Sequence, residues 1–330
     1  MLERRTFLKA TLGGALAASA SGCERSEAPR YDPNAFPLPA VSRVAVLRAE
    51  AYDRPLEAVV QHGIELAGVA VRGRRVVVKP NLVEFDPAGV INTHPAVIAA
   101  TVVALRRLGA REVIVAEGPG HRRDTEYLLE ASGLRGALHD AGVRYVDLNV
   151  DAVRAVPLRS RFTGLTHLHL PVTVLEADLL VSMPKLKTHH WAGVTLAMKN
   201  MFGIVPGTIY GWPKNLLHQV GIPNSIVDIN AALALPRLAI VDGIVGMEGN
   251  GPIQGEACAA GVVVIGDDFP AVDASCARIM GVLPERVAHL RWAGGFLGNV
   301  EEARIEQLAE DPARFRQDFV LPPGFAKLRG

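Results

Sequence analysis

The chain has 330 residues, of which 49% are hydrophobic and 21% charged, a balance typical of a globular protein with a large core. Its formal net charge is +1 and its aromatic content is 5%, so nucleic acid is excluded from the expected partners. The cysteines Cys23, Cys258 and Cys276 form no CxxC pair, and we expect no iron–sulfur cluster held by this chain. Whether Cys258 and Cys276 form a disulfide is left open by the sequence.

The N-terminal residues carry an export pattern rather than a folded element. Residues 4–9 (RRTFLK) match a twin-arginine motif, and the weakly apolar Ala/Gly segment that follows is too short to span a membrane. Residues 20–23 (ASGC) resemble a lipobox, which predicts a signal peptide over residues 1–22 and lipidation of Cys23. Cleavage by ordinary signal peptidase after Ala20 is the alternative.

The location that we expect follows from these motifs. The twin-arginine export machinery would deliver the protein to the periplasm or to the outer face of the cytoplasmic membrane, where a lipid on Cys23 would anchor it. Residues 23–40 contain four prolines and little periodicity, which predicts a tether between the membrane and the folded domain.

Beyond this tether, continuous Val/Ile runs alternate with helical patterns. The predicted strands span residues 41–49, 75–79, 112–116, 144–148, 179–182, 238–241 and 261–265. The predicted helices span residues 54–67, 95–108, 125–131, 134–141, 270–280, 284–290 and 300–308. This order predicts an α/β domain over residues 41–330, with a largely parallel sheet flanked by helices. Dense Gly and Pro between about 150 and 235 predict a second lobe, with a polar cleft at the C-terminal ends of the strands.

Charged or polar residues follow most of the predicted strands, and we single out these positions because ligands of open α/β sheets bind beyond the carboxyl ends of the strands. The residues are Lys79 and Asn81, Glu117, the group Lys185, Lys187 and His189, the pair Asp242 and Glu248, and Asp267 with Asp268. One such residue would be ordinary, since strands commonly end in polar residues. Their repetition predicts a single convergent site.

The lysines indicate a small anionic ligand. Lys185 and Lys187 are two residues apart, so on an extended segment they share a face, where two ammonium groups repel unless an anion lies between them. This favours a carboxylate or a phosphate. Lys199 and Asn200 lie on a predicted helical turn that extends the binding set; a surface charge at Lys199 and simple solvation of Lys79 are the alternatives.

Histidines and carboxylates supply candidates for proton transfer and for metal binding. His189 is expected to exchange protons, whereas His189 and His190 together are poorly placed for one metal ion, because adjacent side chains diverge. His94 precedes a predicted helix and could be only a cap neighbour. The carboxylates could hold a divalent cation, although their spacing matches no metal signature; Asp267 and Asp268 could equally cap the next helix. The cofactor therefore stays unknown.

These segments in combination resemble the family catalogued as domain of unknown function 362, over about residues 41–298. The resemblance rests on KPNLV (79–83), the Thr-His-Pro segment (93–95), VAEGPG (115–120), MPKLKTH (183–189), MKNMFGIVPG (198–207) and DGIVGMEGNGP (242–252). Some members carry an appended iron–sulfur module whose cysteines this sequence lacks. The family implies the domain type and no reaction, and its layout is similar to the two lobes of nickel-pincer lactate racemase-like proteins.

Three functions remain open at this point. The first is an enzyme acting on a small anion, with His189, Glu117 and Asp242 in catalysis and with binding by Lys79, Asn81, Lys185, Lys187, Lys199, Asn200 and Glu248. The second is a non-catalytic ligand- or cofactor-binding lipoprotein. The third is a redox-associated component without its own iron–sulfur cysteines. The glycine-rich residues 246–255 would form a loop able to cradle an anion in each case.

Overall fold

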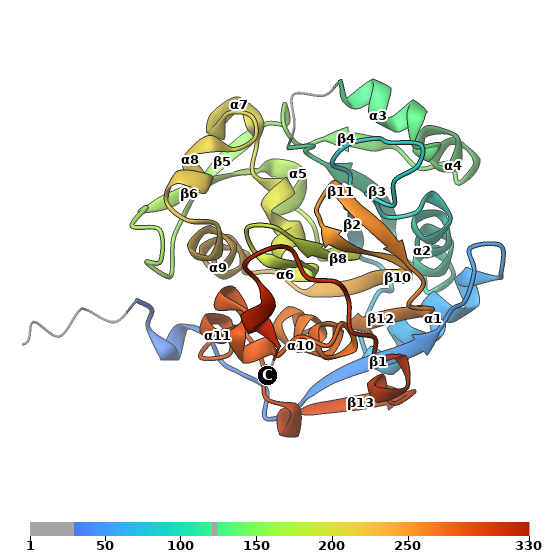
Figure 1. Cartoon of the computed structure of the whole chain (residues 1–330). Coiled ribbons are helices and arrows are strands. Elements are labelled where there is room, and N and C mark those ends of the chain that lie inside the picture. Colours follow the sequence, from blue (N-terminus) through green and yellow to red (C-terminus); the bar gives the residue numbers. More distant parts are fainter. Residues whose placement is uncertain (1–29, 121–123, 330) are drawn as a thin grey trace, which may run out of the picture.

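A large sheet runs through the described part of the chain, residues 30–120 and 124–329 of a computed structural model (Figure 1). Its strands are β1 (Ser42–Arg48), β2 (Arg75–Pro80), β3 (Glu112–Glu117), β4 (Tyr145–Asp147), β7 (Leu179–Met183), β8 (Lys185–His189), β9 (Gly193–Thr195), β10 (Arg237–Asn250), β11 (Gln254–Cys258), β12 (Val262–Gly266) and β13 (Ile305–Ala309). The order is β13-β1-β12-β10-β7-β2-β3-β4, while β8 and β11 pair with β10, and β9 pairs with β8. A separate hairpin joins β5 (Val153–Pro157) to β6 (His167–Pro171).

Most neighbouring strands are parallel, as the alternation of strands and helices predicts. Strands β10, β7, β2, β3 and β4 all run in one direction, and β12 is antiparallel to both of its neighbours, β10 and β1. The carboxyl ends of β2, β3 and β7 therefore meet at one edge of the sheet, which is where such sheets bind ligands.

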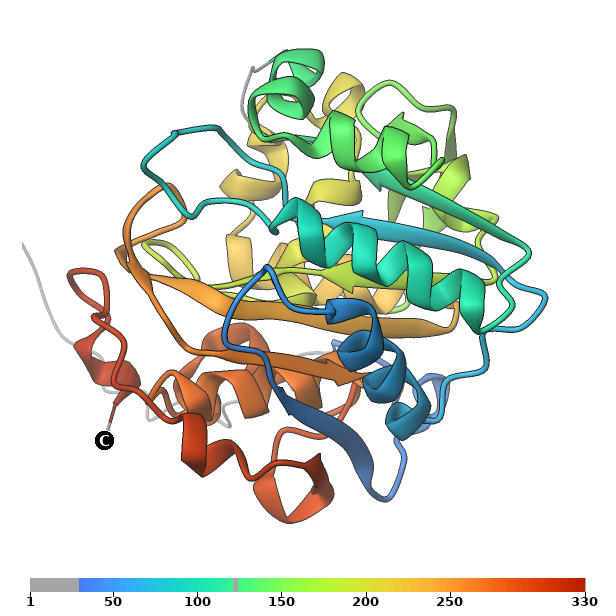
Figure 2. The ribbon, with the colours of Figure 1, turned by 90° about the vertical axis from the view of Figure 1, so that its right-hand side faces the viewer.

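Helices cover both faces of the sheet, which explains the uninterrupted Val/Ile runs of its strands. They are α1 (Leu56–Ala67), α2 (Pro95–Arg107), α3 (Thr125–Ala131), α4 (Leu134–Asp140), α5 (Val172–Leu175), α6 (Ala197–Asn200), α7 (Gly207–Tyr210), α8 (Asn215–Gln219), α9 (Ile222–Ala232), α10 (Phe269–Ile279) and α11 (Ala288–Ala293). Val76 and Val78 pack on the face of α1 and α2, in front of the sheet in Figure 2, and Val77 packs on the opposite face with α6, α9 and α10.

Two segments differ from the expectations. Residues 300–308 form a single 3-10 turn and then strand β13, where a helix is predicted; Ser42 of β1 pairs with Ile305, so an open sheet edge outweighs the local helical pattern. Residues 246–255 form a hairpin of β10 and β11 rather than an open anion-binding loop. The glycine at position 255 permits this pairing, because a Cβ there would lie 2.3 Å from the Glu248 carbonyl oxygen.

Three further expectations concern residues 150–235, the N-terminal segment and membrane-spanning helices. The range 150–235, predicted as a second lobe, supplies the β5–β6 hairpin and α5–α9, together with β7 and β8 of the main sheet. The twin-arginine segment and Cys23 lie outside the described residues. Among the helices of residues 30–120 and 124–329, none is long and apolar enough to cross a membrane.

A buried ion pair links β8 to β10 beneath the carboxyl edge of the sheet. The Lys185 ammonium lies 2.6 Å from Asp242, and both side chains are almost fully buried. The Tyr52 hydroxyl donates to Asp242 at 3.0 Å, and the backbone amide of His94 donates to the same carboxylate at 2.9 Å. The His94 ring stacks on Tyr52 and caps α2, accepting from the Ala96 amide. Asp242 thus has a full set of donors within the fold.

Because Lys185 and Asp242 are buried together, we expect substitutions of either residue to lower the free energy of unfolding strongly and in a coupled way. Asp242→Asn would leave the Lys185 ammonium buried without a counter-charge, and we expect it to lower the free energy of unfolding by about 3–5 kcal/mol. Urea unfolding of Asp242→Asn, Lys185→Met and the double variant measures this effect. The double variant should lose clearly less than the sum of the two single losses, and strict additivity would contradict the coupling.

Candidate functional site

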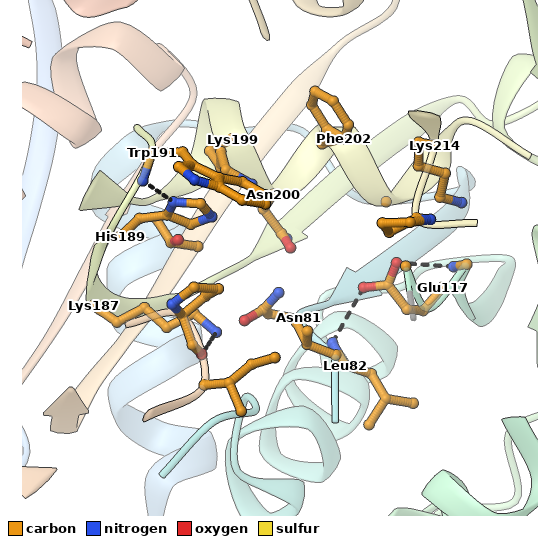
Figure 3. Close-up of a pocket in the computed structure, with 18 of the residues that line it drawn as sticks. Asn81, Leu82, Glu117, Lys187, His189, Trp191, Lys199, Asn200, Phe202 and Lys214 are labelled. Atoms are coloured by element: carbon orange, nitrogen blue, oxygen red, sulfur yellow. Dashed lines mark hydrogen bonds between the residues drawn. The ribbon is translucent and has the colours of Figure 1, made fainter. Parts of the chain in front are cut away.

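A cavity of about 270 Å³ opens at the carboxyl ends of β2 and β3, beside β8 and α6 (Figure 3). Seven of the residues singled out in the sequence line it: Lys79, Asn81, Glu117, Lys187, His189, Lys199 and Asn200. They come from strand ends and from the helical turn that follows β9, so the fold brings together residues separated by more than a hundred positions. The volume is small for a ligand pocket, which indicates a ligand of few atoms.

Lys79, Glu117 and Asn200 form a closed network at the floor of the cavity. The Lys79 ammonium donates to Glu117 at 2.5 Å, to the Asn200 side-chain oxygen at 2.9 Å and to the Pro80 carbonyl at 2.9 Å. Glu117 also accepts from the backbone amides of Leu82 and Gly118. Burial lowers the pKa of Lys79 while Glu117 raises it, and all three N–H bonds of the ammonium are used within the fold. The network therefore shapes the cavity rather than offering free charge to a ligand.

Lys187 presents a buried ammonium with no carboxylate partner in the described residues. Its Nζ donates to the carbonyls of Ile91 at 2.8 Å and of Pro252 at 3.1 Å. Burial, followed by the charges of Lys199, Lys185 and Lys79, holds the pKa of Lys187 well below its ordinary value. The negative charge of an anion in the cavity would offset both the burial of the Lys187 ammonium and its repulsion by the other lysines.

Lys199 has fewer partners than the other cavity lysines. It is half-buried, and within residues 30–120 and 124–329 its Nζ makes no hydrogen bond or ion pair. The ammonium lies 5.2 Å from the centre of the Phe202 ring, a cation–π contact. Burial, and then the charge of Lys79, lower its pKa from 10.5 to about 8. At pH 7 about a tenth of Lys199 is therefore neutral amine, far more than for a lysine of ordinary pKa.

Lys214 is a cavity residue that the sequence analysis missed. It follows a Trp-Pro turn instead of a predicted strand, and its backbone has a positive φ of 70° at the start of α8. Its Nζ donates to the Asn149 side-chain oxygen at 2.6 Å and to the Val205 carbonyl at 2.5 Å. Burial lowers the pKa of Lys214 to about 8. The available signal was a lysine in a turn, which sequence alone does not distinguish from a solvated one.

His189 is held in one tautomer by the backbone. Its Nδ1 accepts from the amides of Trp191 at 3.0 Å and Ala192 at 3.3 Å, and the first of these bonds is drawn in Figure 3. Burial and the neighbouring charges of Lys199 and Lys187 lower the pKa of His189 well below its ordinary value. The ring is therefore neutral with its proton on Nε2, where it acts as a hydrogen-bond donor.

Two further side chains complete the cavity wall. The Asn81 Oδ1 and the Thr195 Oγ1 are buried and lack a hydrogen-bond partner among the residues described. Trp191 is 57% exposed and meets the rings of His190 and His218 edge-on at 4.5 and 5.6 Å. The Asn81 oxygen can only accept a hydrogen bond, whereas the Thr195 hydroxyl can donate one to a ligand oxygen, and buried polar atoms are nearly always paired.

Several candidates lie outside the cavity. Lys185 and Asp242 form the buried pair under the sheet edge, so the counter-charge expected between Lys185 and Lys187 is partly supplied by the protein itself. Glu248 accepts from the Val320 amide at 2.8 Å near the C-terminal segment. Asp268 caps α10. Cys258 and Cys276 are both free thiols. Within residues 30–120 and 124–329, no group of three His, Cys, Asp or Glu side chains is arranged to hold a metal ion.

The close fit over the Lys79 network predicts that Gly203 tolerates no side chain. A Cβ at position 203 would lie 2.2 Å from the Glu117 carboxylate and 2.7 Å from the Lys79 ammonium. We expect Gly203→Ala to lower the free energy of unfolding by about 1–3 kcal/mol, as overpacking does. Gly136→Ala in α4 is the matched control: its Cβ would meet nothing within 4 Å, and we expect stabilisation of about 0.5–1 kcal/mol. Equal effects in urea unfolding would refute the close fit.

Comparison with solved structures finds matches at low sequence identity. The lactate racemase apoprotein from Thermoanaerobacterium thermosaccharolyticum matches with a TM-score of 0.44 and 14% identity over 75% of this chain and 58% of that one. A Thermotoga maritima protein from a structural genomics consortium matches with a TM-score of 0.39 and 13% identity over 66% of this chain and 56% of that one. The chain thus spans little more than half the length of either.

Sequence comparison identifies a relative and a family. The Thylakoid-associated protein sll1697 of Synechocystis sp. (strain PCC 6803) is 26% identical over 261 residues, which cover 75% of this chain and 77% of the relative. The model of a family described as Domain of unknown function (DUF362) matches residues 76–278, which include the strand ends around the cavity. The chain therefore belongs to the DUF362 family.

Proposed function

We propose that this protein is an enzyme that binds a small organic anion, a carboxylate or a phosphate, in the cavity at the carboxyl edge of the sheet. One observation carries the proposal: Lys187, Lys199 and Lys214 all face this cavity, and none of them has a carboxylate partner in the described residues. Glu117, the acidic residue in the lining, is already paired with Lys79. The cavity thus carries an excess of positive charge in a desolvated setting.

The energetics of burial support an anionic occupant. Removing an ammonium group from water is costly unless a counter-charge is present, and the lowered pKa values of Lys187, Lys199 and Lys214 express that cost. A bound carboxylate would supply the counter-charge to the ammonium groups that it contacts and raise their pKa values again. Charge-assisted hydrogen bonds of this kind contribute about 1.5–3 kcal/mol each.

In this proposal His189 and Glu117 have different roles. The Nε2–H of a neutral His189 would donate to an oxygen of the substrate and polarise it, because Nδ1 is already occupied by two amides. Glu117 would position Lys79 and the chain segment after β2. Proton exchange would then fall to an amine whose pKa is near neutral, such as that of Lys199.

A second candidate is a binding protein without catalysis. It is favoured by the absence of a free carboxylate base among the described residues of the cavity, since the Glu117 oxygens accept from Lys79 and two backbone amides. The same anion would bind in both cases. Prolonged incubation of the bound compound with the protein distinguishes the two candidates: an enzyme would convert the compound, whereas a binding protein would release it unchanged.

The variant Lys199→Met tests the binding proposal, and its melting temperature shows whether the variant is still folded. At pH 7 we expect affinity for propionate or inorganic phosphate, measured by titration calorimetry, to fall by about 10–100-fold. The pKa of Lys199 is about 8 in the folded protein, below the ordinary 10.5 of an unfolded chain, so protonating this lysine costs more in the folded state and lowers the stability of the protein at pH 7. Methionine carries no charge, so the variant should melt at a higher temperature than the wild type at pH 7. This gain should vanish as the pH rises above about 10.5. Unchanged affinity for both anions would refute the proposal.

We further propose export by the twin-arginine route and anchoring through Cys23, which the cyanobacterial relative's thylakoid association supports. We expect Cys23→Ser to move the protein from the membrane fraction to the soluble fraction, since removing the acyl chains removes the anchor. Fractionation of the exporting host, with palmitate labelling, measures this. Wild-type protein that carries no label would contradict lipidation, and export of an Arg4→Lys, Arg5→Lys variant would contradict the twin-arginine route.

A further inference from the structure

We infer that Lys199 is a nucleophilic amine that forms an imine with the carbonyl group of a small 2-oxo acid bound in the cavity. This inference rests on the proposed function, because it names the substrate class and the reacting residue of the same site. It makes Lys199 a catalytic residue rather than one more positive charge. The observations that carry it are the freedom of its amine, the neighbours that surround it and the donors placed around it.

Freedom of the amine separates Lys199 from the other cavity lysines. Lys79 uses all three of its N–H bonds within the fold, and Lys187 and Lys214 each donate to two buried acceptors. Turning one of these amines into an imine would leave buried acceptors unpaired, which is costly. Lys199 makes no such bond within the described residues, so its Nζ can reach a carbonyl carbon without breaking one.

The groups that face Lys199 favour its neutral, nucleophilic form. Those that interact with it electrostatically are Lys79 from β2, Lys187 and His189 from β8, His190 after that strand and His289 from α11. Every one of them is a cation or an imidazole. Burial among positive neighbours is the setting in which lysines act as imine-forming nucleophiles.

The remaining donors suit the other end of a 2-oxo acid. Lys187 retains one N–H bond beyond its two protein acceptors, and this bond can donate to a carboxylate. Lys214 lies on the opposite side of the cavity (Figure 3). His189 offers its Nε2–H to the carbonyl oxygen. A cavity of about 270 Å³ admits a molecule the size of pyruvate. A carbonyl beside a carboxylate is therefore the chemistry that these groups match.

The reaction balances without a further reactant. The lone pair of the neutral Lys199 amine attacks the carbonyl carbon, the C–N bond forms, and the π pair moves to oxygen. A proton passes from nitrogen to that oxygen to give the carbinolamine. Loss of the hydroxyl group with one more proton releases water and leaves the C=N bond. Once protonated, the imine withdraws electrons from the adjacent C–H and C–C bonds, which makes them easier to break.

Reductive trapping on the full chain tests the inference. The protein is incubated with pyruvate and sodium cyanoborohydride, which reduces an imine to a stable secondary amine, and the adduct is located by intact mass and peptide mapping. We expect one 1-carboxyethyl group, on Lys199. The exposed Lys327 serves as an internal control, since a merely basic surface lysine should stay unmodified at the same dose. Lys199→Arg keeps the charge, cannot form an imine, and should abolish the adduct.

The outcomes separate this inference from the proposed function. Propionate, which has no carbonyl, should bind the cavity and slow the trapping. If propionate binds and pyruvate leaves Lys199 unmodified, the imine is refuted while anion binding stands. If the adduct forms at Lys187 or Lys214, or equally at Lys327, the assignment to Lys199 is wrong. If neither compound binds, both ideas fail. Mapping on the wild-type chain keeps the test valid even if the arginine variant does not fold.

Discussion

The burial of lysine ammonium groups at the carboxyl edge of the sheet is the constraint on which the rest of the structure depends. Each ammonium is accommodated differently. Lys79 and Lys185 have carboxylate partners, Lys187 and Lys214 have only carbonyl or amide oxygens, and Lys199 has the face of an aromatic ring. Lys79 at the cavity floor is thus compensated, whereas Lys187, Lys199 and Lys214 in the cavity wall are not, and these three concentrate positive potential in the cavity.

The backbone around the cavity is arranged to keep these charges in place. Strand β8 presents Lys185, Lys187 and His189 at alternate positions, so one short strand carries a row of basic groups from the buried pair to the cavity wall. Glycines let neighbouring layers approach this row closely: a Cβ at Gly251 would lie 2.2 Å from the Thr188 carbonyl oxygen. The resulting space is small, which suits a ligand of few atoms.

Protonation and shape act together in this site. The two amides that hold His189 make it a donor, and burial together with the charge of Lys79 leaves part of Lys199 as free amine. A donor beside an amine is a more specific arrangement than a basic cluster, because it distinguishes between the oxygen and the carbon of a carbonyl group. The binding of an anion would itself change these protonation states, so ligand charge and reactivity are linked.

The sequence by itself determined the sheet, its buried strands and the position of the cavity at the carboxyl edge. These follow from short Val/Ile runs such as residues 75–79 and from the polar residues that end them, and both signals are local. The strand at residues 305–309 was mispredicted because its partner edge, β1, lies far away in the chain. Only the tertiary structure decided which lysine meets a carboxylate. Lys185 and Asp242 are 57 residues apart, and Lys214 reaches the cavity through an irregular segment rich in Gly and Pro. The pairing of buried charges depends on long-range packing and desolvation, which local periodicity does not encode.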